Sequence, residues 1–358
     1  MGTVYNQLGQ YSEAIAAIRQ ALLLQAQQGR RNLGSGLLTE LGHAYQSQGE
    51  YANALVAFQQ AQRSAVLEQD AFGELSAWIQ VGNSYETLGN YGAALTAYEK
   101  SLEAAQELNN LQAEGAALGS LGNVLTLLGQ PDTALERYEQ ALVLQQSMGD
   151  RHGALVTQIN LGRLYYDAQD TDQATPQLHT ALDTARDLGD RLSEANALNI
   201  LGQLYRDQSE EAAAVEAFQQ ALSLYQAEAN LRGEVSALAN LGQTAETFGD
   251  MTTALSWFQQ ALPLAQSIGD RATLAKLLSA LGRLERQQNN LDEAIAYYQQ
   301  AVEVRDAMGF RTDSLSPDQR ATFIETVSAD YYALAELLQE RDRPEDAQAV
   351  LDRLQQGF

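Results

Sequence analysis

The 358-residue chain is rich in Ala, Leu, Gln and Glu, contains no cysteine, and carries a formal net charge of −24. The lack of cysteine excludes disulfides and thiolate chemistry, and the negative charge disfavours binding to nucleic acid, whose phosphates it repels. No apolar run approaches the roughly 18 residues that a membrane span requires, and no signal sequence opens the chain, so we expect a cytoplasmic protein without membrane contacts. The composition favours an almost wholly helical fold.

A 40-residue period runs through residues 1–310 and divides them into eight blocks, of which the first lacks the start of its first helix. Position 2 is glycine and position 14 is alanine in all eight blocks, and position 21 is alanine in seven. Position 18 is aromatic in six blocks, at Phe58, Tyr98, Tyr138, Phe218, Phe258 and Tyr298. A period sustained over this length predicts one array of repeated units.

Each block shows apolar residues at helical spacing on both sides of a break near position 9 or 10, which predicts a pair of helices. Small residues at positions 2, 14 and 21 let the two helix backbones approach closely. Gly-Asp-Arg recurs at residues 149–151, 189–191 and 269–271, where the glycine is expected to end one helix and the aspartate to cap the next. Pro263 lies inside the second helix of the seventh block and predicts a bend near residues 259–263, or a break of the helix there.

Residues 311–358 depart from the period and are expected to hold a long capping helix and a displaced ninth unit. The Ser-Pro-Asp-Gln stretch at residues 316–319 predicts the start of the long helix, with Pro317 at its first helical position. Leu334 and Ala347 keep the 13-residue offset of the other blocks. The last helix carries apolar residues on one face, namely Ala347, Val350, Leu351, Leu354 and Phe358. We expect this face to be uncovered and to contact another molecule or a further domain.

The order Leu-Gly, Tyr, Gly, Ala, aromatic, Ala resembles the signature of the tetratricopeptide repeat, and the 40-residue period is similar to that of Pins-type adaptors and many bacterial regulators. The resemblance implies an all-α, right-handed tetratricopeptide solenoid, in which the first helix of each pair lines a concave groove for a protein or peptide partner. Residues 314–355 resemble the segment that joins such arrays to a CHAT domain in cyanobacterial proteins. That likeness implies a caspase-like CHAT protease domain in cis after Phe358, left out of this chain.

Residues suited to catalysis or metal binding are not grouped in the sequence. The three histidines, His43, His152 and His179, lie in different blocks and show none of the spacings of metal sites. Carboxylates are plentiful, but no pair stands out as an acid/base couple. We therefore expect no catalytic residue, no metal site, no cofactor and no enzyme activity.

The resemblance places ligand contacts at positions 36 and 39 of one block and at positions 3, 6 and 7 of the next. In the first four blocks these positions hold neither Lys nor Arg, whereas the later blocks place five cations there. The cations are Arg163, Arg206, Lys276, Arg283 and Arg286. The uncharged residues of the candidate peptide-binding groove are Asn123, Asn160, Tyr166, Asn196, Asn199, Gln203, Asn240 and Gln243. We expect the five cations to form one strip on the concave wall.

Two interpretations of this strip stay open. The arginines can bind the carboxylates of an extended acidic segment while the asparagines bind its main chain. Alternatively, Asp167, Asp207 and Glu246 can neutralise the arginines within the chain. For the whole protein, the favoured function is an interaction scaffold that serves as the recognition arm of a CHAT-type protease. The alternatives are a freestanding Pins-like adaptor and the sensing arm of a signalling or transcription regulator.

Overall fold

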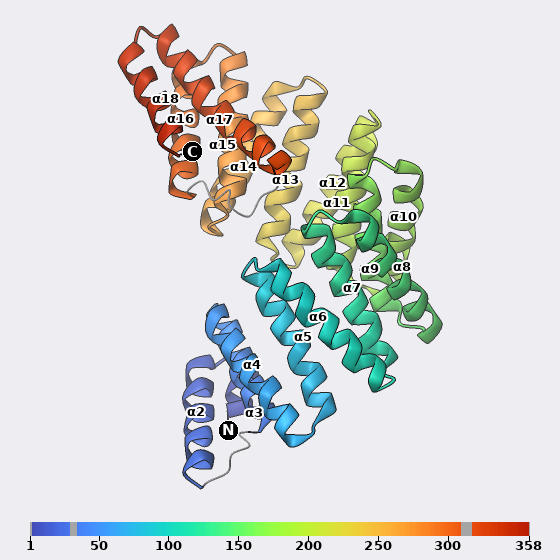
Figure 1. Cartoon of the computed structure of the whole chain (residues 1–358). Coiled ribbons are helices and arrows are strands. Elements are labelled where there is room, and N and C mark those ends of the chain that lie inside the picture. Colours follow the sequence, from blue (N-terminus) through green and yellow to red (C-terminus); the bar gives the residue numbers. More distant parts are fainter. Residues whose placement is uncertain (1, 29–33, 309–316, 358) are drawn as a thin grey trace. The chain divides into compact units, whose positions relative to one another are not determined.

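The computed structural model describes residues 2–28, 34–308 and 317–357 (for residues 26, 317–326, 356 and 357, the backbone alone). Within these ranges the chain forms eighteen helices and no strand (Figure 1). The helices belong to two compact units, Met1–Thr184 and Ala185–Phe358.

The helices of the first unit are α1 (Gly2–Gln7), α2 (Tyr11–Gln27), α3 (Ser35–Ser47), α4 (Tyr51–Glu68), α5 (Ala71–Thr87), α6 (Tyr91–Glu107), α7 (Leu111–Leu127), α8 (Pro131–Met148), α9 (Arg151–Asp167) and most of α10 (Thr171–Leu188). Most helices of the first unit have 17 or 18 residues, whereas α1 has 6 and α3 has 13. The second unit continues in the same way. It contains α11 (Arg191–Asp207), α12 (Glu211–Ala227), α13 (Leu231–Thr247), α14 (Met251–Ser267), α15 (Arg271–Gln287), α16 (Leu291–Met308), α17 (Pro317–Glu340) and α18 (Pro344–Gly357).

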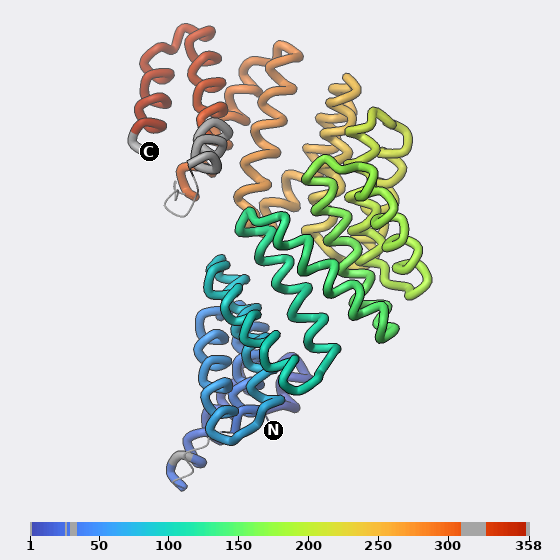
Figure 2. Tube along the Cα trace, turned by 45° about the vertical axis from the view of Figure 1, so that its right-hand side comes forward, coloured from blue at the N-terminus to red at the C-terminus, as the bar shows by residue number. Residues whose placement is uncertain are grey.

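Within each unit the helices pack as pairs, which Figure 2 shows as successive hairpins of the chain. An odd-numbered helix packs on the even-numbered helix that follows it, as α3 does on α4 and α15 does on α16. The even-numbered helix in turn contacts the next odd-numbered one, as α4 contacts α5 and α12 contacts α13. The predicted all-α solenoid of helix pairs is therefore confirmed, and α17 begins at Pro317, where the sequence places it.

The glycine at position 2 is required by the side chain at position 18 of the same block. A Cβ atom added to Gly42 would lie 2.4 Å from Cε1 of Phe58, and one added to Gly122 would lie 2.5 Å from Cε1 of Tyr138. The ring packs directly on the glycine backbone, so the two helices of the pair come closer than a side chain would allow. The expected role of this glycine in close helix packing is thus confirmed.

The Gly-Asp-Arg motif forms the turn between two pairs. Gly149 ends α8 in the left-handed conformation, with φ 70°, and the Asp150 carboxylate accepts the backbone N–H of Gly153 at 2.9 Å. Several other turns place a residue with a Cβ in the same left-handed conformation, although it favours glycine. These residues are Gln69, Asn109, Gln169, Ser209, Ala229, Asn289 and Asp342.

Pro263 does not break its helix. α14 runs without interruption from Met251 to Ser267, so the alternative of a broken helix is wrong. On both sides of the proline, α14 is held by residues buried in one apolar cluster, such as Phe258 and Ala265. Packing of this kind offsets the single intrahelical hydrogen bond that proline cannot donate.

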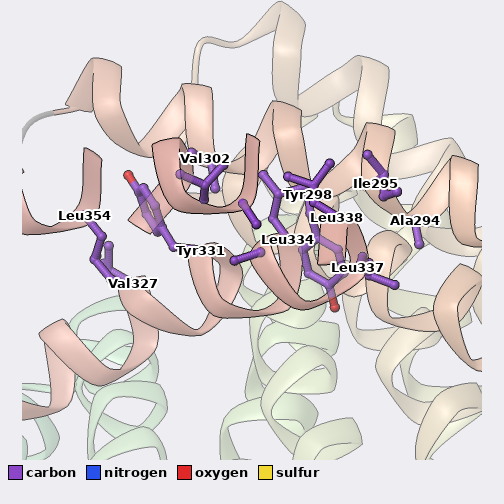
Figure 3. Close-up of a cluster of buried hydrophobic side chains, with 13 residues drawn as sticks. Ala294, Ile295, Tyr298, Val302, Val327, Tyr331, Leu334, Leu337, Leu338 and Leu354 are labelled. Carbon is purple, nitrogen blue, oxygen red and sulfur yellow. The ribbon is translucent and has the colours of Figure 1, made fainter. Parts of the chain in front are cut away.

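The apolar face of α18 is covered by its own chain, so the expectation of an uncovered face is wrong. Ala347, Val350 and Leu354 are buried in one cluster with residues of α16 and α17. Figure 3 shows Leu354 beside Val327 and Tyr331 of α17. The sequence pattern identified the apolar face correctly, but α18 folds back onto α17 as the second helix of a ninth pair. Phe358 lies outside the described residues.

A buried polar network fixes this ninth pair to the array. The Asp330 carboxylate of α17 accepts a hydrogen bond from Arg305 Nε of α16 at 2.5 Å and one from Ser279 Oγ of α15 at 2.7 Å. The side chains of Arg305 and Asp330 are only 11% and 6% exposed. A buried ion pair holds its partners in one geometry, because either charge alone would be strongly destabilising.

Candidate peptide-binding surface

The second unit contains an open pocket on the face formed by the first helices of its pairs. The pocket has a volume of about 440 Å³ and is bordered by α11, α13, α14 and α15. Its lining residues include four members of the predicted groove, namely Arg206, Asn240, Gln243 and Lys276. The structure thus brings together residues that lie up to 70 positions apart in the sequence, Arg206 and Asn240 from the sixth block and Gln243 and Lys276 from the seventh.

Lys276 is the cation of this pocket that is available for a ligand. Its side chain is exposed, and it makes no ion pair with any residue in the described ranges. Arg206 lies across the pocket with its side chain 16% exposed, and its Nε is 3.2 Å from the carboxylate of its neighbour Asp207. The pocket therefore combines one cation without a carboxylate partner, Lys276, with an arginine that Asp207 neutralises, in a chain whose overall charge is strongly negative.

The arginines of α15 are paired within the chain. Arg283 donates from Nε and Nη2 to the two carboxylate oxygens of Glu246, both at 2.8 Å. These hydrogen bonds raise the pKa of Arg283. Arg286 donates to Glu336 at 3.0 Å and to Glu340 at 3.3 Å, both on α17.

The interpretation of intramolecular pairing is therefore confirmed for Arg283 with Glu246 and for Arg206 with Asp207. The partners of Arg286 were not foreseen, because α17 follows the point at which the 40-residue period ends. An arginine whose guanidinium N–H groups already donate to a carboxylate must lose that partner before it can bind another. Lys276 can thus bind a ligand without losing a partner, whereas Arg283 cannot, although both are cations at predicted groove positions.

Several of the predicted asparagines stabilise the array. Asn199 is buried, donates to Ser236 Oγ at 3.4 Å, and accepts a hydrogen bond from Asn240 Nδ2 at 2.9 Å. The prediction that Asn199 contacts a ligand is wrong, because its side chain is enclosed between α11 and α13. Asn196 keeps an exposed side chain but accepts a hydrogen bond from the Tyr225 hydroxyl at 2.7 Å. Gln203 belongs to the same helix and is partly buried.

The first unit uses asparagine in the same way. Asn123 Oδ1 accepts hydrogen bonds from Asn160 Nδ2 at 2.9 Å and from the Tyr138 hydroxyl at 2.6 Å. The asparagine before Leu-Gly therefore links neighbouring first helices in both units. The sequence predicts these asparagines to be groove residues, because it does not show which amides are already bonded within the chain.

Arg163 and Tyr166, the other predicted members in the first unit, lie on α9. The Arg163 guanidinium lies 5.7 Å from the centroid of the Tyr166 ring, a cation–π contact within one helix. Burial raises the pKa of the neighbouring Asp167, and the charge of Arg163 partly offsets this rise. Within the second unit, four of the five expected cations lie on α11 and α15.

The pocket also contains residues that sequence reasoning missed. Thr273 lies one turn before Lys276 on α15, and Thr247 lies one turn after Gln243 on α13. Helical spacing from the predicted residues is a signal that would have found both. Phe258 contributes an apolar wall from α14. Among the described residues, no group of His, Asp and Glu is arranged to hold a metal ion, and no described helix is long and apolar enough to cross a membrane.

Comparison with known proteins identifies the repeat. Models of the tetratricopeptide repeat match residues 73–147, 153–227 and 234–307, and further models with the same description match residues 1–28, 35–65 and 331–353. A search of the curated proteins found no match to the sequence.

Solved structures share the fold at low sequence identity. The apo form of the quorum sensor NprR from B. thuringiensis is 12% identical, with 98% of each chain covered and a TM-score of 0.58. The apo form of RapI is 14% identical over 76% of this chain and 98% of its own, with a TM-score of 0.63. A Rap protein in complex with Competence and Sporulation Factor is 15% identical over 77% of this chain and 76% of its own, with a TM-score of 0.57.

Proposed function

Because the chain belongs to the tetratricopeptide repeat family, we propose that its second unit binds an acidic segment of a partner protein in the pocket around Lys276. The observation that carries this proposal is the exposed Lys276 ammonium, which has no carboxylate partner among the described residues and lies in a pocket with Arg206. In a chain with 46 acidic residues, a pocket that exposes an ammonium group without a carboxylate partner is suited to a ligand of opposite charge. The crystallised complex of a Rap protein with Competence and Sporulation Factor is an example of ligand binding by a related fold.

Charge alone does not provide enough affinity, so the whole pocket must contribute. An exposed ion pair contributes about 0.2–1 kcal/mol, whereas micromolar binding needs about 8 kcal/mol. Ala239 is partly exposed and offers apolar surface for a side chain of the segment, and Gln243 and Asn240 offer amide groups for its main chain. We expect a segment that alternates acidic and apolar residues to use all three kinds of contact.

The two lysines of the chain provide a matched test. A fluorescein-labelled (Asp-Leu)₅ peptide is titrated with wild-type protein and with the Lys276→Glu and Lys100→Glu variants, and binding is followed by fluorescence anisotropy. Lys276→Glu should raise Kd at least tenfold, since it replaces attraction by repulsion. Lys100 lies on α6 of the first unit and pairs with Glu103, so its replacement should leave Kd unchanged. Equal Kd values for all three proteins would contradict the proposal.

We further propose that this array carries out no catalysis itself and recruits partners for a CHAT-type protease domain of a longer protein. Support for this finer assignment comes from residues 314–355, which resemble the junction before such domains. The coding sequence downstream of Phe358 provides the test. A caspase-like domain with a His and a Cys would support the protease assignment, whereas a helix-turn-helix domain would indicate a regulator and a stop codon a freestanding adaptor.

A further inference from the structure

The first unit has grooves on a different side of its helix pairs. One groove lies between α2 and α4 over α3 and has a volume of about 430 Å³. A second lies between α4 and α6 over α5 and has a volume of about 360 Å³. Both are bordered by the second helices of the pairs, whereas the Lys276 pocket is bordered mainly by first helices. The two grooves share α4 as their common wall.

Neither of these two grooves is lined by an acidic residue, and each is lined by one arginine. The α2–α4 groove is lined by Arg19, Leu22, Leu23, Leu41, Tyr45, Asn53, Val56, Ala57 and Gln60. The α4–α6 groove is lined by Gln59, Gln62, Arg63, Trp78, Val81, Tyr85, Ala93, Thr96 and Ala97. The next groove along, between α6 and α8, contains Glu114, Glu136 and Glu139. The first two linings thus lack the carboxylates that line the third, in a chain that is highly acidic.

The floors and rims of both grooves offer apolar and aromatic surface. Leu23 and Val56 are 63% and 51% exposed at the α2–α4 groove. In the α4–α6 groove, Trp78 and Tyr85 are partly buried, and their polar atoms are bonded to Glu74 and Gln59 respectively, which fixes both rings. Exposed apolar side chains that gather in a groove mark an interaction site more often than scattered ones do.

The two arginines are available to a partner. The Arg19 guanidinium lies 5.5 Å from the centroid of the Tyr45 ring, and neither Arg19 nor Arg63 forms an ion pair with a residue in the described ranges. Each groove therefore combines an apolar floor with one cation whose charge is not neutralised by a carboxylate. Complementarity of charge requires an acidic side chain next to an apolar one in whatever occupies these grooves.

We propose that the α2–α4 and α4–α6 grooves together bind an extended segment of a partner protein, with an apolar side chain in each groove and acidic side chains on Arg19 and Arg63. The grooves flank one helix, whose diameter with side chains is about 10 Å. A polyproline II segment rises about 3.1 Å per residue and presents the same face every third residue, so residues i and i+3 are about 9 Å apart. Apolar residues at this spacing reach both grooves, and aromatic-lined grooves are the surfaces on which such segments dock.

The test uses Trp78 as the reporter of its own groove. The chain contains two tryptophans, so a Trp257→Phe variant leaves Trp78 as the sole source of indole fluorescence, and an added Lys276→Glu change disables the pocket of the second unit. This protein is titrated with the peptide (Leu-Glu-Pro)₄. Binding should change the Trp78 emission in a saturable manner, and (Leu-Lys-Pro)₄ and (Ser-Glu-Pro)₄ should each bind at least tenfold more weakly.

Changes in the protein complete the test. In the same background, the double variant Arg19→Glu and Arg63→Glu should raise Kd for (Leu-Glu-Pro)₄ at least tenfold, and Val56→Ser should raise it about threefold. Lys100→Glu reverses a single charge outside both linings and should leave Kd unchanged. An unchanged melting temperature in each variant shows that the fold is intact. No saturable change in Trp78 emission, or equal binding of the three peptides, would overturn the inference without affecting the proposal for Lys276.

Discussion

The two units share one packing scheme but distribute their charged residues differently. In the first unit, the arginines Arg19 and Arg63 lie on grooves between second helices, and the pair Lys100–Glu103 is exposed. In the second unit, Arg206, Lys276, Arg283 and Arg286 lie on first helices, and carboxylates from neighbouring helices neutralise Arg283 and Arg286. The comparison shows that repetition fixes the positions at helix contacts and leaves the other positions free to create different surfaces.

The largest expected effect concerns the polar network of the second unit. Asp330→Ala leaves the Arg305 guanidinium buried without its carboxylate, and loss of one partner of a buried pair costs about 3–5 kcal/mol. The free energy of unfolding, measured by urea denaturation with circular dichroism, should fall by that amount. Glu103→Ala removes the partner of the exposed Lys100 in the first unit and should give no measurable change. Similar losses in both variants would contradict the contrast between the units.

Glycine replacements should affect both units alike. Gly42→Leu and Gly202→Leu place a side chain where the rings of Phe58 and Phe218 already lie, since even a Cβ would be 2.4 Å and 2.6 Å from them. Overpacking of this kind costs about 1–3 kcal/mol. Thermal unfolding should show a lower melting temperature for both variants. A loss confined to one variant would show that the two units do not share this packing scheme.

The tyrosine at position 18 should make stability depend on alkaline pH. Burial raises the pKa of Tyr138 from 10.0 to about 12, so the folded state retains the phenol proton after the unfolded state has begun to lose it. The contribution to stability is complete below pH 10 and is lost as the pH rises towards 12. Tyr138→Phe removes the part of this dependence that Tyr138 contributes, and it also removes the hydrogen bond to Asn123, at a cost of about 1 kcal/mol at pH 7. Urea denaturation at pH 8 to 11 should show a smaller decrease for the variant, whereas parallel curves would contradict the assignment.

The smallest expected effect concerns the Arg283–Glu246 pair. Glu246→Gln removes the carboxylate that accepts hydrogen bonds from Arg283 Nε and Nη2. The free energy of unfolding should fall by at most about 1 kcal/mol. The released guanidinium adds a cation to the face that carries Lys276, so Kd for the (Asp-Leu)₅ peptide should fall about threefold. Anisotropy titration of the variant beside the wild type measures the change. Weaker binding in the variant would mean that the pair holds the pocket in shape.

The packing of the array could be predicted from the sequence because the signal is repeated in every block. Gly42 and Gly122 occupy equivalent positions, so a single structural reason accounts for both. Arg206 and Lys276 could be placed on one pocket from the same numbering. The pairing of Arg286 with Glu336 could not, because α17 lies beyond the end of the period. The grooves beside Arg19 and Arg63 were also missed, since these arginines occupy different positions in their blocks.

The amides show a second reason why site prediction fell short. Asn199 and Asn240 occupy different positions in their blocks, and only the stacking of α11 on α13 brings their side chains together. An amide that is paired in this way is equivalent in sequence to one that faces solvent. Distinguishing the two requires the contacts between neighbouring pairs, which composition and spacing do not contain.

The left-handed turn residues affect how each repeat opens and closes in the native state. Ala229 and Ser209 adopt φ 52° and φ 64° without being glycine, and this conformation costs an L-residue about 1 kcal/mol relative to glycine. These turn residues line neither the Lys276 pocket nor the two grooves of the first unit. Their conformation therefore lowers the free energy of local opening without altering a ligand contact. Amide hydrogen exchange should therefore be faster around these turns than around Gly149 or Gly249. Substitution of turn residues can thus change how often a single repeat opens, independently of what the array binds.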